Sequence, residues 1–178
     1  TAMSRSTESQ CRQNFAAETE ATVNKQVNTE LYSSYVYLSM AAHFDRDDVA
    51  LHKIADFMRK SSNEKRERAI ELMKFQTMRG GRVVFNDINK PEKMEWASAL
   101  EAFQSVLALE KSTNKSLLDL HAIGDRHNDP HLTLFLEDKH LHQQVESINK
   151  IGKIVTNLRR VGPDMGVYVF DEEENFDL

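Results

Sequence analysis

The sequence contains little cysteine, proline or glycine, and it has no long apolar run. Its 178 residues include one cysteine, three prolines and six glycines. A single cysteine, Cys11, excludes an internal disulfide framework and a cysteine-based zinc site. No apolar stretch approaches the roughly 20 residues of a membrane-spanning helix, and residues 1–10 lack the apolar core of a signal peptide. We therefore expect a cytoplasmic protein that does not bind membranes.

Basic residues are fewer than acidic ones. Lys and Arg number 23 against 28 Asp and Glu, which gives a net charge of −5. This balance excludes a general attraction for nucleic acid or anionic lipid and favours cations as partners. Hydrophobic residues make up 40% and charged residues 29%, which is typical of one soluble domain with much wetted helix surface.

Apolar residues recur at intervals of three and four between the few glycines and prolines, which is the spacing of a buried helix face. The pattern predicts four helices, over about residues 17–44, 49–79, 95–126 and 130–160. The residues expected to face the core are Val23, Val27, Leu31, Leu38 and Ala41, then Leu51, Ile54, Met58, Leu72 and Met73, then Leu100, Phe103, Leu107, Leu117 and Leu118, and finally Leu141, Ile148, Ile151, Val155 and Leu158.

Short polar segments mark the ends of these helices. An aspartate of the turn at residues 45–48 is expected to cap the second helix, and Gly80 is expected to end it. Asp129 and Pro130 predict the start of the fourth helix, as its N-cap and first helical residue. The acidic run at residues 171–174 in the short tail is expected to be frayed or to point into water.

The lengths of the connections predict the fold. Helices of nearly 30 residues are about 42–45 Å long, and the connection at residues 80–94 can span roughly 50 Å. Because Val83, Val84, Phe85 and Ile88 give this segment something to bury, an ordered crossover is favoured over a floppy loop. The expected fold is all-α, a four-helix bundle with one long crossover between the second and third helices and a short C-terminal fifth helix or tail. We predict an N-terminal extension at 1–14, the bundle at 15–162 and a short C-terminal helix or acidic tail at 163–178.

Polar residues interrupt every apolar stripe near the middle of its helix. In an antiparallel bundle they converge at one height. An unpaired buried charge costs several kcal/mol, so the cluster must be paired, hydrated or bound to metal. Its carboxylate, phenol and amide oxygens suit iron or a similar cation. The interrupting residues are Glu30, Tyr37, Lys65, Arg68, Glu110 and Gln144.

Several stretches of the sequence resemble animal ferritin subunits over nearly the whole chain. The resemblance implies a hollow shell of 24 subunits that takes in ferrous iron, oxidises it and holds ferric mineral. The matching stretches are RQNF at 12–15, ELYSSYVYLSM at 30–40, FDRDDVAL at 44–51, RGGRVVF at 79–85, SLLDLHA at 116–122 and DPHL at 129–132.

The resemblance implies an oxidation site with two altered positions. Where heavy-type subunits have Glu-x-x-His on the second helix, this chain has Lys65 and Arg68. Neither side chain donates a lone pair to iron while protonated. We interpret them as side-chain cations that replace bound metal and pair with the glutamates; the alternative is that both swing outward and leave a partial metal site. The positions that match the heavy-type site are Glu30, Tyr37, Glu64, Glu110 and Gln144.

Lysine at the matching position is also found in light-type, non-catalytic subunits, whereas Tyr37 and Gln144 remain heavy-like. Further candidate iron contacts are Glu64, Glu67 and Glu71, whose neighbourhood seeds mineral in ferritins. A solvated helix face is the alternative reading of this acidic spacing.

The resemblance also implies a threefold entry channel, in which His121, Thr133, Leu134 and Glu137 occupy the matching positions. Leu134 replaces the usual aspartate, which predicts weaker attraction for cations. The remaining histidines, His140 and His142 among them, are expected to be ordinary surface residues.

The sequence therefore predicts an iron-storage subunit, binding Fe2+ and Fe3+, whose oxidation centre is impaired. It would assemble as a homo-oligomer or in a mixed shell with active subunits. Two alternatives remain at this point. The first is an active ferroxidase that uses the remaining ligands. The second is a structural helical bundle whose core cluster is a salt-bridge network.

Overall fold

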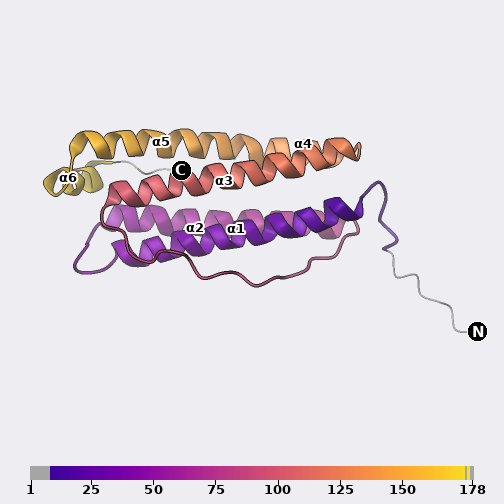
Figure 1. Cartoon of the computed structure of the whole chain (residues 1–178), viewed down its shortest axis with the longest axis horizontal. Coiled ribbons are helices and arrows are strands. Elements are labelled where there is room, and N and C mark those ends of the chain that lie inside the picture. Colours follow the sequence, from indigo (N-terminus) through magenta and orange to yellow (C-terminus); the bar gives the residue numbers. More distant parts are fainter. Residues whose placement is uncertain (1–8, 175, 177–178) are drawn as a thin grey trace, which may run out of the picture.

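The computed structural model describes residues 9–174 and 176, and all regular elements in this part of the chain are helical (Figure 1). The predicted all-α class is therefore confirmed. The elements are α1 (Ala17–Phe44), α2 (His52–Met78), α3 (Ala99–Arg126), α4 (Pro130–Leu136), the π-helical turn η1 (Glu137–Leu141), α5 (His142–Val161) and α6 (Met165–Glu173).

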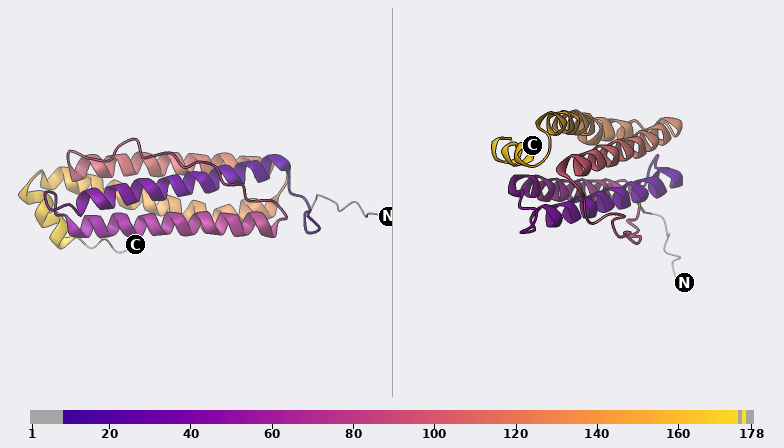
Figure 2. Two further views of the ribbon diagram at one scale, coloured as in Figure 1. Left: turned by 90° about the horizontal axis from the view of Figure 1, so that it is seen from below. Right: turned by 60° about the vertical axis from the view of Figure 1, so that its left-hand side comes forward.

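The long helices lie side by side as two pairs (Figures 1 and 2). One pair is α1 with α2, and in the other α3 packs against the continuous rod formed by α4, η1 and α5. The short helix α6 packs at one end of the bundle against α5 and α2. The predicted four-helix bundle with a short fifth helix is confirmed, whereas the division into three segments at residues 14 and 162 stays a prediction.

Two helix starts differ from the sequence pattern, and one helix is interrupted. The second helix begins at His52 rather than near residue 49, and the third begins at Ala99 rather than near 95. Ser98 supplies the start signal of α3, because its side chain accepts a hydrogen bond from the Glu101 backbone N–H at 3.1 Å. The fourth helix is interrupted by η1, which the apolar spacing did not indicate.

The start of α4 and the end of α2 follow the prediction. Asp129 accepts a hydrogen bond from the Leu132 N–H at 3.1 Å, and Pro130 occupies the first helical position. Gly80 follows α2 with a φ of +81°, a conformation that favours glycine. A Cβ atom at Gly80 would also lie only 2.9 Å from the backbone nitrogen of Arg12. Both the backbone conformation and this close approach therefore disfavour any other residue at this position.

The cap of α2 corrects two predictions at once. No side chain of the preceding turn caps the helix. Asp171 of α6 does so instead, because its carboxylate accepts the N–H groups of Ile54 at 2.8 Å and Lys53 at 3.3 Å. Asp171 is therefore helical and only 3% exposed rather than frayed, while Glu172 and Glu173 point into water.

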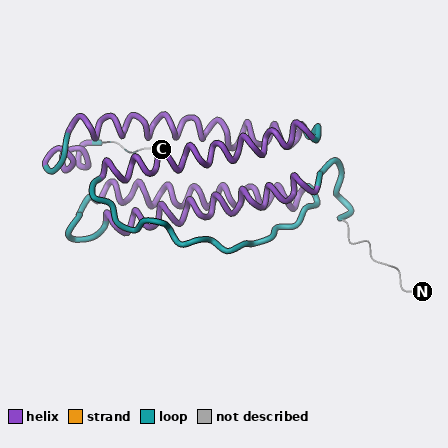
Figure 3. The backbone as a smooth tube through the Cα atoms, viewed as in Figure 1, coloured by secondary structure: helices purple, strands orange, loops and turns teal. Residues whose placement is uncertain are grey.

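The crossover runs along the bundle from the end of α2 to the start of α3, as predicted (Figure 3). Its anchors are not those expected. Asn24 and Asn28 of α1 hold its main chain with hydrogen bonds of 3.0 to 3.4 Å. Of the four apolar side chains expected to be buried, Val83 is half-buried. The other three are exposed, Val84 by 55%, Phe85 by 72% and Ile88 by 41%.

The interior contains two apolar clusters. One includes Met40 and Met58, and the other includes Val27 and Leu72. On every long helix the buried residues between the two clusters are polar, so a band of hydrogen-bonding groups crosses the bundle. Two predicted core residues are wrong, since Leu38 and Leu118 are each 50% exposed on the outer faces of their helices.

None of the helices in the described part of the chain is long and apolar enough to cross a membrane.

Candidate functional site

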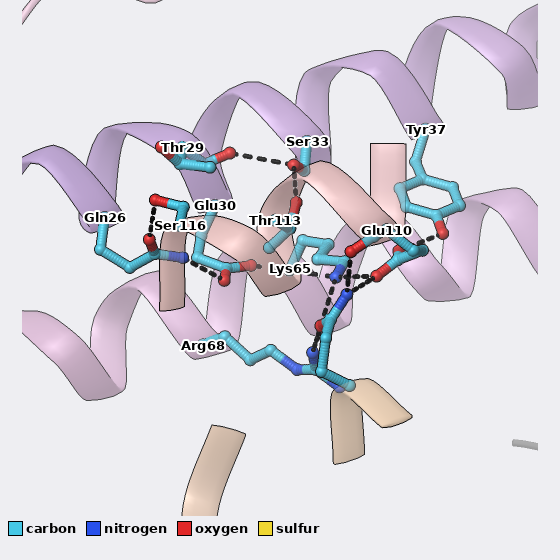
Figure 4. Close-up of polar contacts among 11 residues, drawn as sticks. Gln26, Thr29, Glu30, Ser33, Tyr37, Lys65, Arg68, Glu110, Thr113 and Ser116 are labelled. Atoms are coloured by element: carbon cyan, nitrogen blue, oxygen red, sulfur yellow. Dashed lines mark hydrogen bonds and ion pairs between the residues drawn. The ribbon is translucent and has the colours of Figure 1, made fainter. Parts of the chain in front are cut away.

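The polar band in the middle of the bundle brings together side chains from all four long helices (Figure 4). We call this set the polar layer. Every member is buried, so each charge and each hydrogen-bonding group must find its partner inside the protein. The polar layer consists of Gln26, Glu30, Ser33 and Tyr37 of α1, Lys65 and Arg68 of α2, Glu110 and Thr113 of α3, and Gln144 of α5.

Glu110 is the most heavily bonded member of the polar layer. Its Oε2 atom lies 2.6 Å from the Lys65 ammonium. The Tyr37 hydroxyl donates to Oε1, and the Gln144 amide donates both to Oε2 and to the Glu110 backbone carbonyl. Burial alone would raise the pKa of Glu110, but Lys65, Tyr37 and Gln144 together hold that pKa below its usual value. Glu110 is therefore a carboxylate whose oxygens are already engaged.

Glu30 lies in the same layer with fewer partners. Its Oε1 atom accepts a hydrogen bond from the Gln26 amide at 3.0 Å. Its Oε2 atom has no hydrogen-bond partner among the described residues and lies 4.0 Å from the Lys65 nitrogen. Burial raises the pKa of Glu30, against the opposing influence of Lys65 and Arg68. The single ammonium therefore sits much closer to one glutamate than to the other.

Arg68 has an amide rather than a carboxylate as its partner. Its Nη1 atom donates to the Gln144 Oε1 atom at 2.8 Å, and the Lys65 ammonium is 3.3 Å from the same oxygen. The expectation that both cations pair with the glutamates is met for Lys65 and wrong for Arg68. The alternative in which both swing outward is also wrong, because both side chains are buried.

Glu64 lies at the edge of the polar layer and does not join its hydrogen bonds. It is half-buried and lines a small cavity beside Lys65 and Arg68. It makes no hydrogen bond or ion pair with the residues that the structure describes. Glu67 is exposed, with its carboxylate 3.7 Å from Arg66, and lines a groove between α2 and α5 together with Glu64 and Glu71.

The polar layer does not suit a pair of metal ions as it stands. The ammonium of Lys65 occupies the space beside the Glu110 carboxylate, and the guanidinium of Arg68 engages the Gln144 oxygen. Over residues 9–174 and 176, no group of three or more His, Cys, Asp or Glu side chains is placed to hold a metal ion. The chemistry available here is a network of buried ion pairs and hydrogen bonds.

A second predicted group lies away from the polar layer. The His121 Nε2 atom is 2.7 Å from the Glu137 carboxylate, and its Nδ1 atom is 3.4 Å from Asp125. Leu134 of α4 is 56% exposed. The structure thus brings His121 and Glu137 together and leaves Leu134 at the surface.

Comparison with known proteins identifies the fold family. The ferritin-like domain matches residues 20–161. The chain belongs to the ferritin family. It is 53% identical to soma ferritin of Lymnaea stagnalis over 165 residues, covering 93% of this chain and 95% of that one. It is also 53% identical to the middle ferritin subunit of Aquarana catesbeiana over 167 residues, covering 92% and 95%. The ferritin-1 heavy chain of Schistosoma mansoni is 51% identical over 163 residues, covering 92% and 94%.

Within this ferritin bundle, His140 is a buried residue. It was expected at the surface but is 0% exposed. Its ring packs edge-on against Phe135, with the ring centroids 5.1 Å apart. Because η1 contains an extra residue in its turn, it changes which side chains of this helix face the core. A signal was available, since His140 lies four residues after buried Leu136 and four before Gln144.

Proposed function

We propose that this chain is an iron-storage ferritin subunit whose own iron-oxidation centre is blocked by side-chain cations. Its relatives are named as ferritins and ferritin subunits at about half identity over nearly the whole chain, which supports iron storage. The observation that carries the blocked centre is the 2.6 Å contact between Lys65 and Glu110 inside the polar layer. This contact satisfies the carboxylate that a ferrous ion would need.

Electrostatics supports this reading of Lys65. A divalent cation about 4 Å from a buried ammonium is repelled by roughly 8 kcal/mol at an effective dielectric constant of 20. One or two oxygen ligands do not recover that energy. The Glu110 oxygens are also engaged by Tyr37 and Gln144, so iron would have to displace three donors. Light-type behaviour follows: the subunit stores iron oxidised slowly or by other subunits.

Exposed apolar residues support assembly into a shell. Tyr35 and Leu38 lie exposed on α1, and Phe85 and Ile88 lie exposed on the crossover. A neighbouring subunit in a shell would remove these side chains from water, which favours assembly. We propose a closed ferritin shell of 24 subunits in the cytoplasm, built from this chain alone or mixed with active subunits. The cargo is iron, entering as Fe2+ and stored as Fe3+.

Rates of iron oxidation test the blocked centre. Ferrous iron is added to purified shells in air, and the ferric product is followed by absorbance. The double variant Lys65→Glu, Arg68→His is expected to gain rapid oxidation, while either single change gains little because one buried cation remains. Arg66→His serves as a matched control on the exposed face of α2.

Two outcomes would contradict the proposal. Rapid oxidation by the unaltered chain would favour the active-ferroxidase alternative. Light scattering that finds only monomers or dimers in neutral buffer would favour a structural bundle held by its buried salt-bridge network.

A further inference from the structure

A small cavity lies beside the polar layer, between α2 and α5. Its volume is about 20 Å³, enough for one water molecule or one ion of similar size. Ser61, Glu64 and Arg68 of α2 line it together with Ser147 of α5. The last three residues also line the larger groove of about 540 Å³ between the same helices. The small cavity and the groove are therefore neighbours that share these three side chains.

Arg68 brings an unbalanced positive charge to this cavity. Its guanidinium carries five N–H donors, and one of them is engaged, by the Gln144 oxygen. No carboxylate among the described residues lies within 4 Å of the guanidinium. A buried cation without a counterion is costly, by several kcal/mol. The remaining donors of Arg68 therefore call for an anionic acceptor.

The nearby carboxylates do not supply that acceptor. Glu110 is bonded to Lys65, Tyr37 and Gln144. Glu30 is held by Gln26 on α1 and is not part of the cavity lining. Glu64 lines the cavity but forms no ion pair with the described residues. Glu64 and Glu110 both line the cavity, but neither forms an ion pair with the Arg68 guanidinium, whose remaining donors face the cavity without a carboxylate partner among the described residues.

We propose that the cavity binds one small monovalent anion of halide size, held by the Arg68 guanidinium. The hydroxyls of Ser61 and Ser147 line the same space, and neither has a hydrogen bond to another described residue, so both are placed to donate to the ion. Charge-assisted hydrogen bonds from a guanidinium are stronger than neutral ones, which favours an anion over water. This inference goes beyond the proposed function, because the anion is detected without iron.

Glu64 is the natural competitor of the anion. It lies four residues before Arg68 on α2, the spacing at which helical side chains meet. A rotamer change would let its carboxylate pair with the guanidinium and displace a bound ion. Neutralising Glu64 should therefore strengthen anion binding, whereas removing the Arg68 charge should abolish it. These opposite effects distinguish a built site from general surface attraction.

Bromide is the probe, because it scatters anomalously and matches the expected size. Crystals of the full chain are soaked in sodium bromide, and chloride binding in solution is titrated by the width of the ³⁵Cl resonance. We expect an anomalous peak in the cavity beside Arg68, Ser61 and Ser147. Arg68→Gln is expected to weaken chloride binding by about tenfold or more, the size of a lost charge-assisted hydrogen bond. Glu64→Gln is expected to strengthen it, and the control Arg66→Gln should change nothing.

Each contrary result overturns the inference. These are a water-only peak in the cavity, a bromide peak that persists in Arg68→Gln, or Glu64 found paired with Arg68. If Arg68→Gln does not assemble, the double variant Ser61→Ala, Ser147→Ala removes two donors without removing charge. Chloride binding that is unchanged in that variant would also contradict the proposal.

Discussion

His140 makes the folded subunit sensitive to acid. Burial, together with the charges of Arg68 and Lys65, lowers the pKa of His140 to about 4, against an ordinary value near 6.5. Neither ring nitrogen has a hydrogen-bond partner among the described residues, so no acceptor there stabilises the protonated imidazole. The unfolded chain therefore takes up a proton at a pH where the folded chain does not. Folding stability falls as the pH drops from about 6.5 towards 4.

Replacing His140 removes this titration. Between pH 6.5 and 4, the parent chain and His140→Phe both lose part of their free energy of unfolding. We expect the loss to be about 3 kcal/mol smaller in His140→Phe, because that variant lacks the buried imidazole. Urea denaturation at a series of pH values measures the difference. His142→Phe is the matched control, because that side chain is 73% exposed. An equal loss of stability in the parent and in His140→Phe would contradict the assignment.

At the scale of single elements, α2 depends on a cap from α6. Asp171 accepts two N–H groups of the first turn of α2 across the end of the bundle. Asp171→Ala is expected to lower the free energy of unfolding by about 1–2 kcal/mol, the usual effect of losing an N-cap. Amide exchange at Lys53 and Ile54 should accelerate. Glu172→Ala, on the exposed side of α6, should leave both measurements unchanged.

Long-range partners of this kind explain which elements the sequence could predict. Apolar spacing predicted α1 to the residue, and Asp129 with Pro130 predicted the start of α4, because those signals are local. The cap from Asp171 could not be predicted, since it depends on a contact between residues more than 100 positions apart.

The polar layer shows the same division. Stripe positions alone indicated that Glu30, Lys65 and Glu110 would meet. Which cation would pair with which oxygen depends on side-chain reach, so Arg68 bonded to an amide was missed. The π-helical turn has no counterpart in the apolar spacing, so the burial of His140 was missed too.

At the scale of the whole molecule, the exposed crossover should decide assembly. Phe85 is 72% exposed within the subunit, so its replacement removes little packing inside the bundle. Phe85→Asp is expected to block association and leave a folded monomer, as measured by light scattering and circular dichroism. Asn86→Asp adds the same charge one residue further along and should still assemble. A Phe85→Asp protein with the mass of the parent shell would exclude this surface from the interface.

Entry of iron should depend on Leu134. In the shell that we propose, Leu134 stands where the ferritin resemblance places an aspartate at a threefold channel, so each copy would lack one carboxylate there. Leu134→Asp is expected to raise the rate of iron uptake and make it more sensitive to salt, because added charge attracts cations through a screened field. Leu134→Asn controls for polarity without charge. Uptake that does not respond to Leu134→Asp would mean that iron enters elsewhere or that oxidation limits the rate.

The polar layer between the two apolar clusters also determines how the helices align along their axes. Apolar side chains alone tolerate sliding, because a helix displaced by one turn, about 5.4 Å, still presents an apolar face to its neighbours. The same slip would carry Lys65 away from Glu110 and leave both charges buried without partners, which costs about 3–5 kcal/mol. The ion pair therefore fixes the register of α2 against α3, because only one alignment keeps the two charges together. Exchanging the layer for apolar residues should yield a bundle that is harder to unfold and less uniquely aligned.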